Sequence, residues 1–374
     1  MEQALAVPER FKRLLEPGQI GKLTTRNRIR LAPTCTHFCS DDGDITDREI
    51  GFLAERARGG AAIVTTGVAS VEPEGQIPKV LRAWDDAVIP GFLKCTRAIH
   101  SHGALAFFQV GHFGRYSDLK QTVPKGPSVM TSPVERWGTC RDMSTEEIGE
   151  IVTAHVEAAR RGKEGGFDGV DVLGIAGYLL SSFFSPLTNK RTDGYGGSLQ
   201  KRARIGLEIL DGIKARLGRD FPLIFRVCGS ELMDGGNSEE DLIRIASMLE
   251  EAGADAISVG VAWHESRVSS LGMEIAQGHW LHLAENMRKA LKVPVMMAYR
   301  INSPDIAERA LEEGKIDFWE SCRQLLADPD LPNKIREGRP EDIAPCVACN
   351  EGCFSRVWNY QPIWCIINAR LGHE

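Results

Sequence analysis

The chain of 374 residues has no apolar run close to the roughly 18 residues that a membrane span requires. Its first residues, MEQALAVPERFKRLLEPG, have none of the apolar core of a signal peptide. The formal net charge of −6 gives no basic field to attract phosphates, which argues against a nucleic-acid partner. A GxGxxG turn is also absent, which disfavours a dinucleotide-binding open sheet. These absences predict a soluble, cytoplasmic protein without a nucleic-acid or membrane partner.

Short apolar runs alternate with helix-like segments along most of the chain. The runs are too continuous for strands with one exposed face, and they are typical of parallel strands covered on both faces. We expect eight strands, near residues 31, 63, 107, 171, 224, 258, 295 and 318. Eight strands separated by helices favour an α/β fold of the (β/α)₈ TIM-barrel type over an open doubly wound sheet.

The expected helices begin and end at recognisable signals. Thr46 with Glu49 and Ser144 with Glu147 have the spacing of a capping box, in which the two side chains bond each other's backbone N–H groups. Gly253 is typical of a residue that follows a helix. These signals place helices between the expected strands.

Four of the ten cysteines lie within the last 29 residues, in the sequence CVACNEGCFSRVWNYQPIWC. They are Cys346, Cys349, Cys353 and Cys365. In a cytosolic chain such a group indicates a metal site and not a disulfide framework. Soft sulfur ligands select zinc, copper(I) or iron–sulfur clusters. Structural zinc usually pairs two similar CxxC motifs, so a triplet with a distant fourth cysteine favours iron–sulfur, with zinc as the alternative.

From about Arg26 to Glu374 the motifs, including the terminal CIINARLGHE, resemble the iron–sulfur branch of the old yellow enzyme family. That branch includes the bacterial 2,4-dienoyl-CoA reductases, which also have three residues between the second and third cysteines, and trimethylamine dehydrogenase. The resemblance implies an FMN-binding barrel over residues 1–340. It also implies a [4Fe–4S] cluster held by the four cysteines in a C-terminal extension over residues 341–374. Full-length relatives continue into a region that binds FAD and NAD(P)H, which would belong here to a missing domain or a partner protein.

The resemblance assigns several residues to the flavin ring. Pro33, Thr34 and Cys35 of RNRIRLAPTC end the first strand, and this segment follows the pyrimidine edge in the family. Gly67 resembles the small residue that lets the isoalloxazine lie close. Gln109, in a QxxHxGR pattern, matches the glutamine that bonds the pyrimidine carbonyl and ring N–H.

Other matches lie along the rest of the cofactor. Arg226 resembles the arginine near flavin N1, where positive charge stabilises the anionic reduced ring. Arg300, Cys322 and Arg323 would hold the phosphate, since guanidinium groups and backbone N–H groups bind a dianion well. Many relatives have glycine at Cys322 and at Tyr299, so this part of the pattern departs from the family.

The segment LGIAGYLLSS carries the chemistry of the expected active site. Simple enone reductases of the family have a His-x-x-His or His-x-x-Asn pair where this chain has Leu173 and Ala176, which disfavours that activity. Tyr178 matches the proton-donating tyrosine of the dienoyl-CoA reductases, and its ordinary pKa near 10 keeps it protonated. His264 of WHESR matches their second catalytic residue.

The leading hypothesis is therefore reduction of an activated C=C bond in an enoyl- or dienoyl-CoA thioester, with Tyr178 and His264 as proton donors. Electrons would arrive from a donor domain or protein. An amine dehydrogenase or N-demethylase that passes electrons outward is the alternative, and an electron-transfer subunit is another. Amine dehydrogenases attach FMN through a cysteine at the position of Cys35, but Leu173 and Ala176 do not match their residues, which favours non-covalent FMN. The sequence is compatible with an oligomer.

Overall fold

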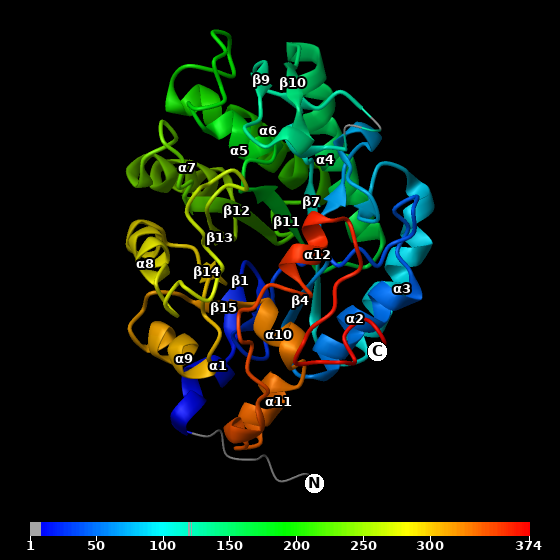
Figure 1. Ribbon diagram of the computed structural model, residues 1–374, viewed down its shortest axis with the longest axis vertical. Coiled ribbons are helices and arrows are strands. Elements are labelled where there is room, and N and C mark those ends of the chain that lie inside the picture. Colours follow the sequence, from blue (N-terminus) through cyan, green and yellow to red (C-terminus); the bar gives the residue numbers. More distant parts are fainter. Residues whose placement is uncertain (1–8, 119, 121) are drawn as a thin grey trace.

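The computed structural model describes residues 9–118, 120 and 122–374, and its centre is a closed barrel of eight parallel strands (Figure 1). Each strand pairs with the next, β7 pairs with β11, and β15 returns to β3, which closes the ring. This confirms the expected (β/α)₈ architecture and all eight strand positions. The strands are β3 Ile29–Leu31, β4 Ile63–Thr65, β7 Leu105–Gly111, β11 Gly169–Gly174, β12 Leu223–Ser230, β13 Ala256–Val261, β14 Val295–Met297 and β15 Phe318–Ser321.

Helices follow the barrel strands and surround them (Figure 1). The outer helices are α2 Asp47–Arg58, α3 Ile89–His100, α4 Thr145–Glu164, α6 Leu199–Leu217, α7 Glu239–Ala252, α8 Leu281–Ala290, α9 Pro304–Glu312 and α10 Arg323–Ala327. Shorter helices are α1 Lys12–Leu15, α5 Leu179–Phe184, α11 Leu331–Arg336 and α12 Phe354–Trp358. Additional short strands are β1 Gly18–Ile20, β2 Leu23–Thr25, β5 Ala69–Ser70, β6 Leu81–Arg82, β8 Lys125–Gly126, β9 Met130–Thr131 and β10 Thr139–Asp142.

The antiparallel β1–β2 hairpin closes the end of the barrel at which the strands begin. Ile20 of this hairpin belongs to a buried cluster with Ile63, Phe107, Ile224 and Phe318, which stand at or near the first positions of their strands. Further along the strands the barrel interior becomes polar. The functional end of the barrel therefore lies opposite an apolar plug, at the carboxyl ends of the strands.

One of the two expected capping boxes forms completely. Ser144 accepts from the backbone of Glu147, whose carboxylate accepts from the Ser144 backbone. At α2, Thr46 accepts from the Glu49 backbone, but the Glu49 carboxylate accepts from the Thr36 hydroxyl instead. The expected reciprocal box at Thr46 is therefore wrong, because Glu49 points into the interior toward the segment that follows β3.

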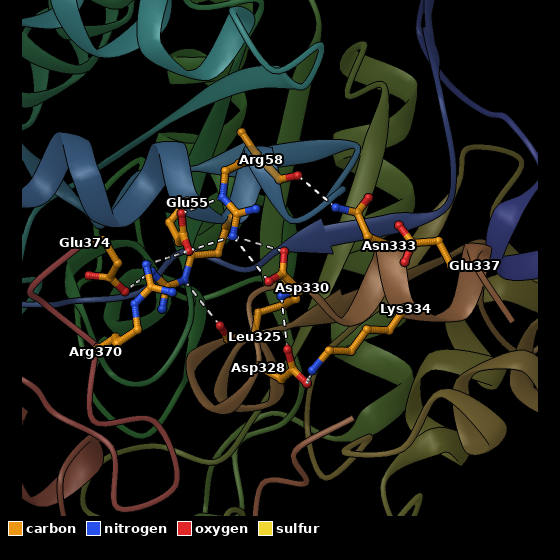
Figure 2. Close-up of polar contacts among 12 residues, drawn as sticks. Glu55, Arg58, Leu325, Asp328, Asp330, Asn333, Lys334, Glu337, Arg370 and Glu374 are labelled. Atoms are coloured by element: carbon orange, nitrogen blue, oxygen red, sulfur yellow. Dashed lines mark hydrogen bonds and ion pairs between the residues drawn. The ribbon is translucent and has the colours of Figure 1, made fainter. Parts of the chain in front are cut away.

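After α11 the chain returns across the barrel mouth in a segment of residues 341–374, called here the cysteine segment. Its only α-helix among the described residues is the five-residue α12. Figure 2 shows Arg58 of α2 bonded both to Glu55 of the same helix and to Asp330 at the start of α11, with Arg370 of the cysteine segment close to Glu55. The buried carboxylate of Glu374 lies 2.6 Å from Arg56. Polar contacts with α2 thus anchor the end of the cysteine segment.

Across residues 9–118, 120 and 122–374, no helix is both long and apolar enough to cross a membrane.

Candidate active site

A cavity of about 490 Å³ opens at the carboxyl ends of the barrel strands. Its lining includes Cys35 after β3, Gln109 of β7 and Arg226 of β12. Tyr178, after β11, and His264, after β13, line the same cavity. Residues from distant parts of the sequence meet here because all parallel strands end on one face of the barrel.

A second cavity of about 190 Å³ adjoins the first, and both are lined by Pro33, Cys35, Arg226 and Tyr299. Its other walls include Thr34 after β3 and, around the start of α10, Cys322 and Arg323. The cofactor residues expected from the sequence that line one or both cavities are Pro33, Thr34, Cys35, Gln109, Arg226, Cys322 and Arg323.

Two of the expected cofactor residues do not line either cavity. A Cβ atom on Gly67 would lie 2.7 Å from the carbonyl oxygen of Thr34, so this glycine permits close contact between the ends of β3 and β4. Arg300 is buried and donates from Nε to the carbonyl of Ile275 at 2.7 Å. Burial and the nearby Arg323 guanidinium lower the pKa of Arg300. Two cations held this close favour an anion between or beside them.

Unpartnered donors and the two arginines make these cavities suitable for FMN. Arg226 Nε and Asn302 Nδ2 are buried and have no hydrogen-bond partner among the described residues. Burial opposes the charge of Arg226, but the nearby carboxylates of Glu320 and Asp171 outweigh it and raise the Arg226 pKa. The two cavities therefore share the positive charge of Arg226, and Arg323 adds a second guanidinium to the smaller one, with the buried Arg300 nearby.

Tyr178 and His264 form a hydrogen-bonded pair beside the larger cavity. The Tyr178 hydroxyl oxygen lies 2.8 Å from His264 Nε2. The chain turns sharply before Tyr178, with φ values of 64° at Ala176 and 87° at Gly177. A Cβ on Gly177 would lie 2.2 Å from the Tyr116 hydroxyl, so only glycine fits there. The turn thus directs Tyr178 toward the segment after β13.

The environment sets the protonation of both members of the pair. Burial, followed by the nearby Cys35 and Tyr299, raises the pKa of Tyr178 above its ordinary value. Burial and the neighbouring Arg115 guanidinium lower the pKa of His264 to about 4. At neutral pH the site therefore holds a phenol and a neutral imidazole. Such an imidazole with its hydrogen on Nε2 donates to the phenol oxygen, which leaves the hydroxyl hydrogen free to face the cavity.

A buried ion pair next to His264 was not expected from the sequence. Arg115 bonds both carboxylate oxygens of Glu265, and both side chains are buried. The Arg115 guanidinium also donates to the Tyr116 hydroxyl at 2.8 Å and lies over the Trp263 ring. Arg115 belongs to the QxxHxGR motif and Glu265 to the WHESR motif. The sequence therefore showed both motifs but did not show that these two residues pair.

An aromatic wall from the cysteine segment was also not expected. Phe354 and Trp358 of α12 line the larger cavity. The Trp358 ring lies 4.9 Å from the His264 ring and 5.3 Å from that of Trp137. The segment that carries the cysteines therefore also shapes the space beside the Tyr178–His264 pair. No sequence signal other than the aromatic residues near Cys353 pointed to this role.

All four cysteines of the segment, Cys346, Cys349, Cys353 and Cys365, line one cavity of about 20 Å³. All four thiols are free. Within the part of the chain that the structure describes, no group of three or more His, Cys, Asp or Glu side chains converges as a site for a single metal ion. Thiolates are ligands of both zinc and iron–sulfur clusters, and the four thiols of this segment line the same cavity.

Leu173 and Ala176 depart from the family pattern, and the structure shows their positions together with those of Arg267 and His112. Leu173 and Ala176 line the larger cavity and give it an apolar side. Arg267 stands exposed at its rim. His112 is buried and bonded to Glu72 at 2.8 Å.

A parallel eight-stranded barrel with arginines and a glutamine at its mouth, beside a tyrosine–histidine pair, defines a barrel oxidoreductase with a flavin site. Residues 13–342 match the model of the NADH:flavin oxidoreductase / NADH oxidase family, so this chain belongs to that family.

Known proteins of similar sequence support the iron–sulfur branch of old yellow enzymes. The chain is 40% identical over 364 residues to the metal reductase of Desulforamulus reducens, covering 96% of this chain and 54% of that protein. It is 34% identical over 391 residues to the cinnamate reductase of Clostridium sporogenes, covering 98% and 59%. The solved 2-naphthoyl-CoA reductase complex superposes with a TM-score of 0.95 at 42% identity, covering 97% and 58%. The chain thus spans less than three fifths of each.

Proposed function

We propose that the chain is the flavin- and cluster-binding part of a reductase that saturates a C=C bond conjugated to a thioester carbonyl. The observation that carries the proposal is the hydrogen bond of 2.8 Å between the Tyr178 hydroxyl and His264 Nε2. This pair lies beside a cavity that Gln109 and Arg226 also line. Relatives named for the reduction of cinnamate and 2-naphthoyl-CoA support this class of substrate.

When bound, FMN would supply a hydride to the electrophilic carbon of the substrate. Tyr178 would donate its hydroxyl proton to the carbon next to the carbonyl, which balances the hydride and completes a two-electron reduction. His264 would donate a hydrogen bond from Nε2 to the phenolate that remains. A neutral imidazole can stabilise that negative charge in this way without becoming charged itself. Leu173 and Ala176 would pack against the acyl chain.

The four cysteines would hold a [4Fe–4S] cluster, which exchanges single electrons. Residues 341–374 would then form a cluster-binding extension of an FMN-binding barrel over residues 1–340. The relatives are longer than this chain, so FAD and NAD(P)H would enter through a further domain or a partner protein.

The amine dehydrogenase alternative is less well supported by the site. An alkylammonium substrate would be recognised by aromatic rings. Here the Arg136 guanidinium already lies 5.0 Å from the Tyr360 ring centre and 5.8 Å from that of Trp358. An electron-transfer subunit would have no need of the Tyr178–His264 pair.

A substrate panel tests the proposal. The flavin of the anaerobically reduced protein should be reoxidised by cinnamoyl-CoA or crotonyl-CoA, with the saturated thioester as product. The oxidised protein should not be reduced by dimethylglycine or sarcosine. Reduction by the amines without reoxidation by any enoyl thioester would overturn the proposal in favour of the amine alternative.

A further inference from the structure

A buried charged network lies inside the barrel, directly below the cavity. Arg30 of β3 is fully buried and bonds the carboxylates of Asp171 and Glu320. Its Nε atom donates to the Thr65 hydroxyl at 2.9 Å. Ser258 donates to the second oxygen of Glu320 at 2.8 Å. Every charge of Arg30, Asp171 and Glu320 is thus paired, as burial demands.

Only one of the two carboxylates bonds a side chain that lines the larger cavity. Gln109 and Asp171 are direct partners in the β7–β11 register, and Gln109 Nε2 donates to Asp171 Oδ1 at 3.0 Å. Glu320 is instead the register partner of Arg30 on the other side of the barrel. Asp171 therefore links the charged network to a residue that lines the cavity, whereas Glu320 bonds no cavity-lining glutamine.

The bond to Asp171 determines how the Gln109 amide is turned. A carboxylate that bonds a guanidinium has no hydrogen to give, so the amide nitrogen of Gln109 must face it. The amide oxygen then turns away from Asp171, and it and the second hydrogen on Nε2 remain for the cavity that Gln109 lines. The part of the cavity wall formed by Gln109, called here the floor, therefore offers an acceptor, the amide oxygen, beside a donor, the amide nitrogen, in a fixed order.

We propose that Asp171 is a positioning residue that fixes the Gln109 amide, so that the floor selects a ring edge with an imide N–H next to a carbonyl. The inference rests on the flavin site of the proposed function, because the isoalloxazine pyrimidine has such an edge. The imide hydrogen bonds the Gln109 oxygen and the neighbouring carbonyl accepts from the Gln109 nitrogen. If the Gln109 amide were reversed, its NH₂ group would face the imide N–H and its oxygen would face the ring carbonyl.

Asp171→Asn is the sharpest perturbation of this arrangement. An asparagine has only one carbonyl oxygen. The charged Arg30 guanidinium binds this oxygen more strongly than the neutral amide of Gln109 does. The asparagine NH₂ then faces Gln109, which must reverse to offer its oxygen. Glu320→Gln is the matched control, because it removes one negative charge from the same guanidinium without touching Gln109.

The measurement is the affinity of the apoprotein for FMN and for 3-methyl-FMN, in which the imide hydrogen is replaced. Wild type should bind FMN more tightly than the methylated flavin by about tenfold, the size of one well-made hydrogen bond with its buried partner. In Asp171→Asn this ratio should fall to within about twofold, mainly through weaker FMN binding. In Glu320→Gln the ratio should stay at the wild-type value even if both affinities change.

An unchanged ratio in a folded Asp171→Asn protein, or an equal loss in Glu320→Gln, would overturn the positioning role while leaving the proposed function intact. A wild-type apoprotein that binds neither flavin would overturn both. If Asp171→Asn does not fold, Asp171→Ser replaces it, since a hydroxyl imposes no fixed order on Gln109. There too the ratio should fall, and a wild-type ratio would count against the proposal.

Discussion

In the barrel, Gln109 meets Asp171 because β7 and β11 pair in register, and the strands hold both side chains without any ligand. The four cysteines of the cysteine segment lie on a chain with one five-residue helix and with positive φ at Ala348, Asn350 and Tyr360. Its Trp364 and Ile366 side chains are 43% and 60% exposed. The barrel thus holds its functional residues by backbone pairing, whereas the cysteine segment depends on side-chain anchors and on whatever its thiols bind.

The largest expected effect is on the cysteine segment. Cys353→Ser should strongly lower the iron and acid-labile sulfide of anaerobically prepared protein, because a cluster that loses one of its four thiolate ligands is not retained in full. FMN content should fall less than iron content, because most residues that line the two cavities belong to the barrel, although Phe354 and Trp358 of the cysteine segment also contribute. Limited proteolysis should then cleave within residues 341–374.

Cys140→Ser is the control for this prediction. Cys140 is a buried barrel-side thiol that lies 3.4 Å from the Ser128 carbonyl, a contact that a serine hydroxyl can also make. Its iron content should equal that of wild type. Zinc in place of iron in the wild-type protein would contradict the cluster.

The second effect concerns the acid supplied from the barrel. Tyr178→Phe keeps the ring and removes the donor, so reoxidation of the reduced flavin by an enoyl thioester should slow by about 10²–10⁴-fold. His264→Ala should also slow it, and the double variant should be less than additive because the two residues share one hydrogen bond. Stopped-flow spectroscopy of flavin reoxidation measures the rates.

Tyr195→Phe is the matched control for Tyr178→Phe. Its hydroxyl bonds Glu208 at 2.8 Å, and Tyr195 does not line the larger cavity. Its reoxidation rate should be that of wild type. A Tyr178→Phe protein that is reoxidised as fast as wild type by a confirmed substrate would leave Tyr178 a packing residue.

The sequence predicted the barrel well because buried parallel strands are continuous apolar runs. Gln109 and Arg226 were expected from the family resemblance, and both line the larger cavity. It did not predict the Arg30–Asp171 link, since strand patterns do not show which interior charges meet across a barrel. It also missed the wall formed by Trp358, which depends on the path of the cysteine segment over the mouth. The Thr46–Glu49 capping box was predicted wrongly because the capping signal and a buried partner, Thr36, compete for one carboxylate.

A third, smaller effect is expected on the pH dependence of stability. It concerns the buried carboxylate of Glu49, which lies where the barrel meets the cysteine segment. Burial raises the pKa of Glu49 to about 7, although the Thr36 hydroxyl, Arg56 and Arg48 act against this shift and Glu374 adds to it. A folded-state pKa above the unfolded value means that the folded state binds the extra proton. The contribution of Glu49 to the free energy of unfolding is therefore fully present below about pH 4.5 and is lost as the pH rises through 7, by about 3 kcal/mol in all.

Glu49→Gln should remove this dependence, because an amide stays neutral and still accepts from Thr36. Thermal unfolding at pH 5 and pH 8 would show the variant close to wild type at the lower pH and more stable at the higher one. Asp305→Asn, on an exposed ion pair with Arg10, serves as the control and should leave the pH dependence as it is. A Glu49→Gln protein with the full wild-type dependence would assign the titration to another group.

The smallest effect is expected at Cys35, where the barrel mouth meets the cysteine segment. The thiol is the position at which a covalent flavin link would form, but burial and the nearby Glu49 carboxylate raise the pKa of Cys35 to about 12. The thiolate is the nucleophile, so a thiol held this far from ionisation is poorly suited to attack the flavin ring. Acid precipitation should release the flavin intact from wild type, and Cys35→Ala should retain FMN with an affinity within a few-fold of wild type. Flavin that stays with the denatured wild-type chain and is lost in Cys35→Ala would instead favour the amine dehydrogenase alternative.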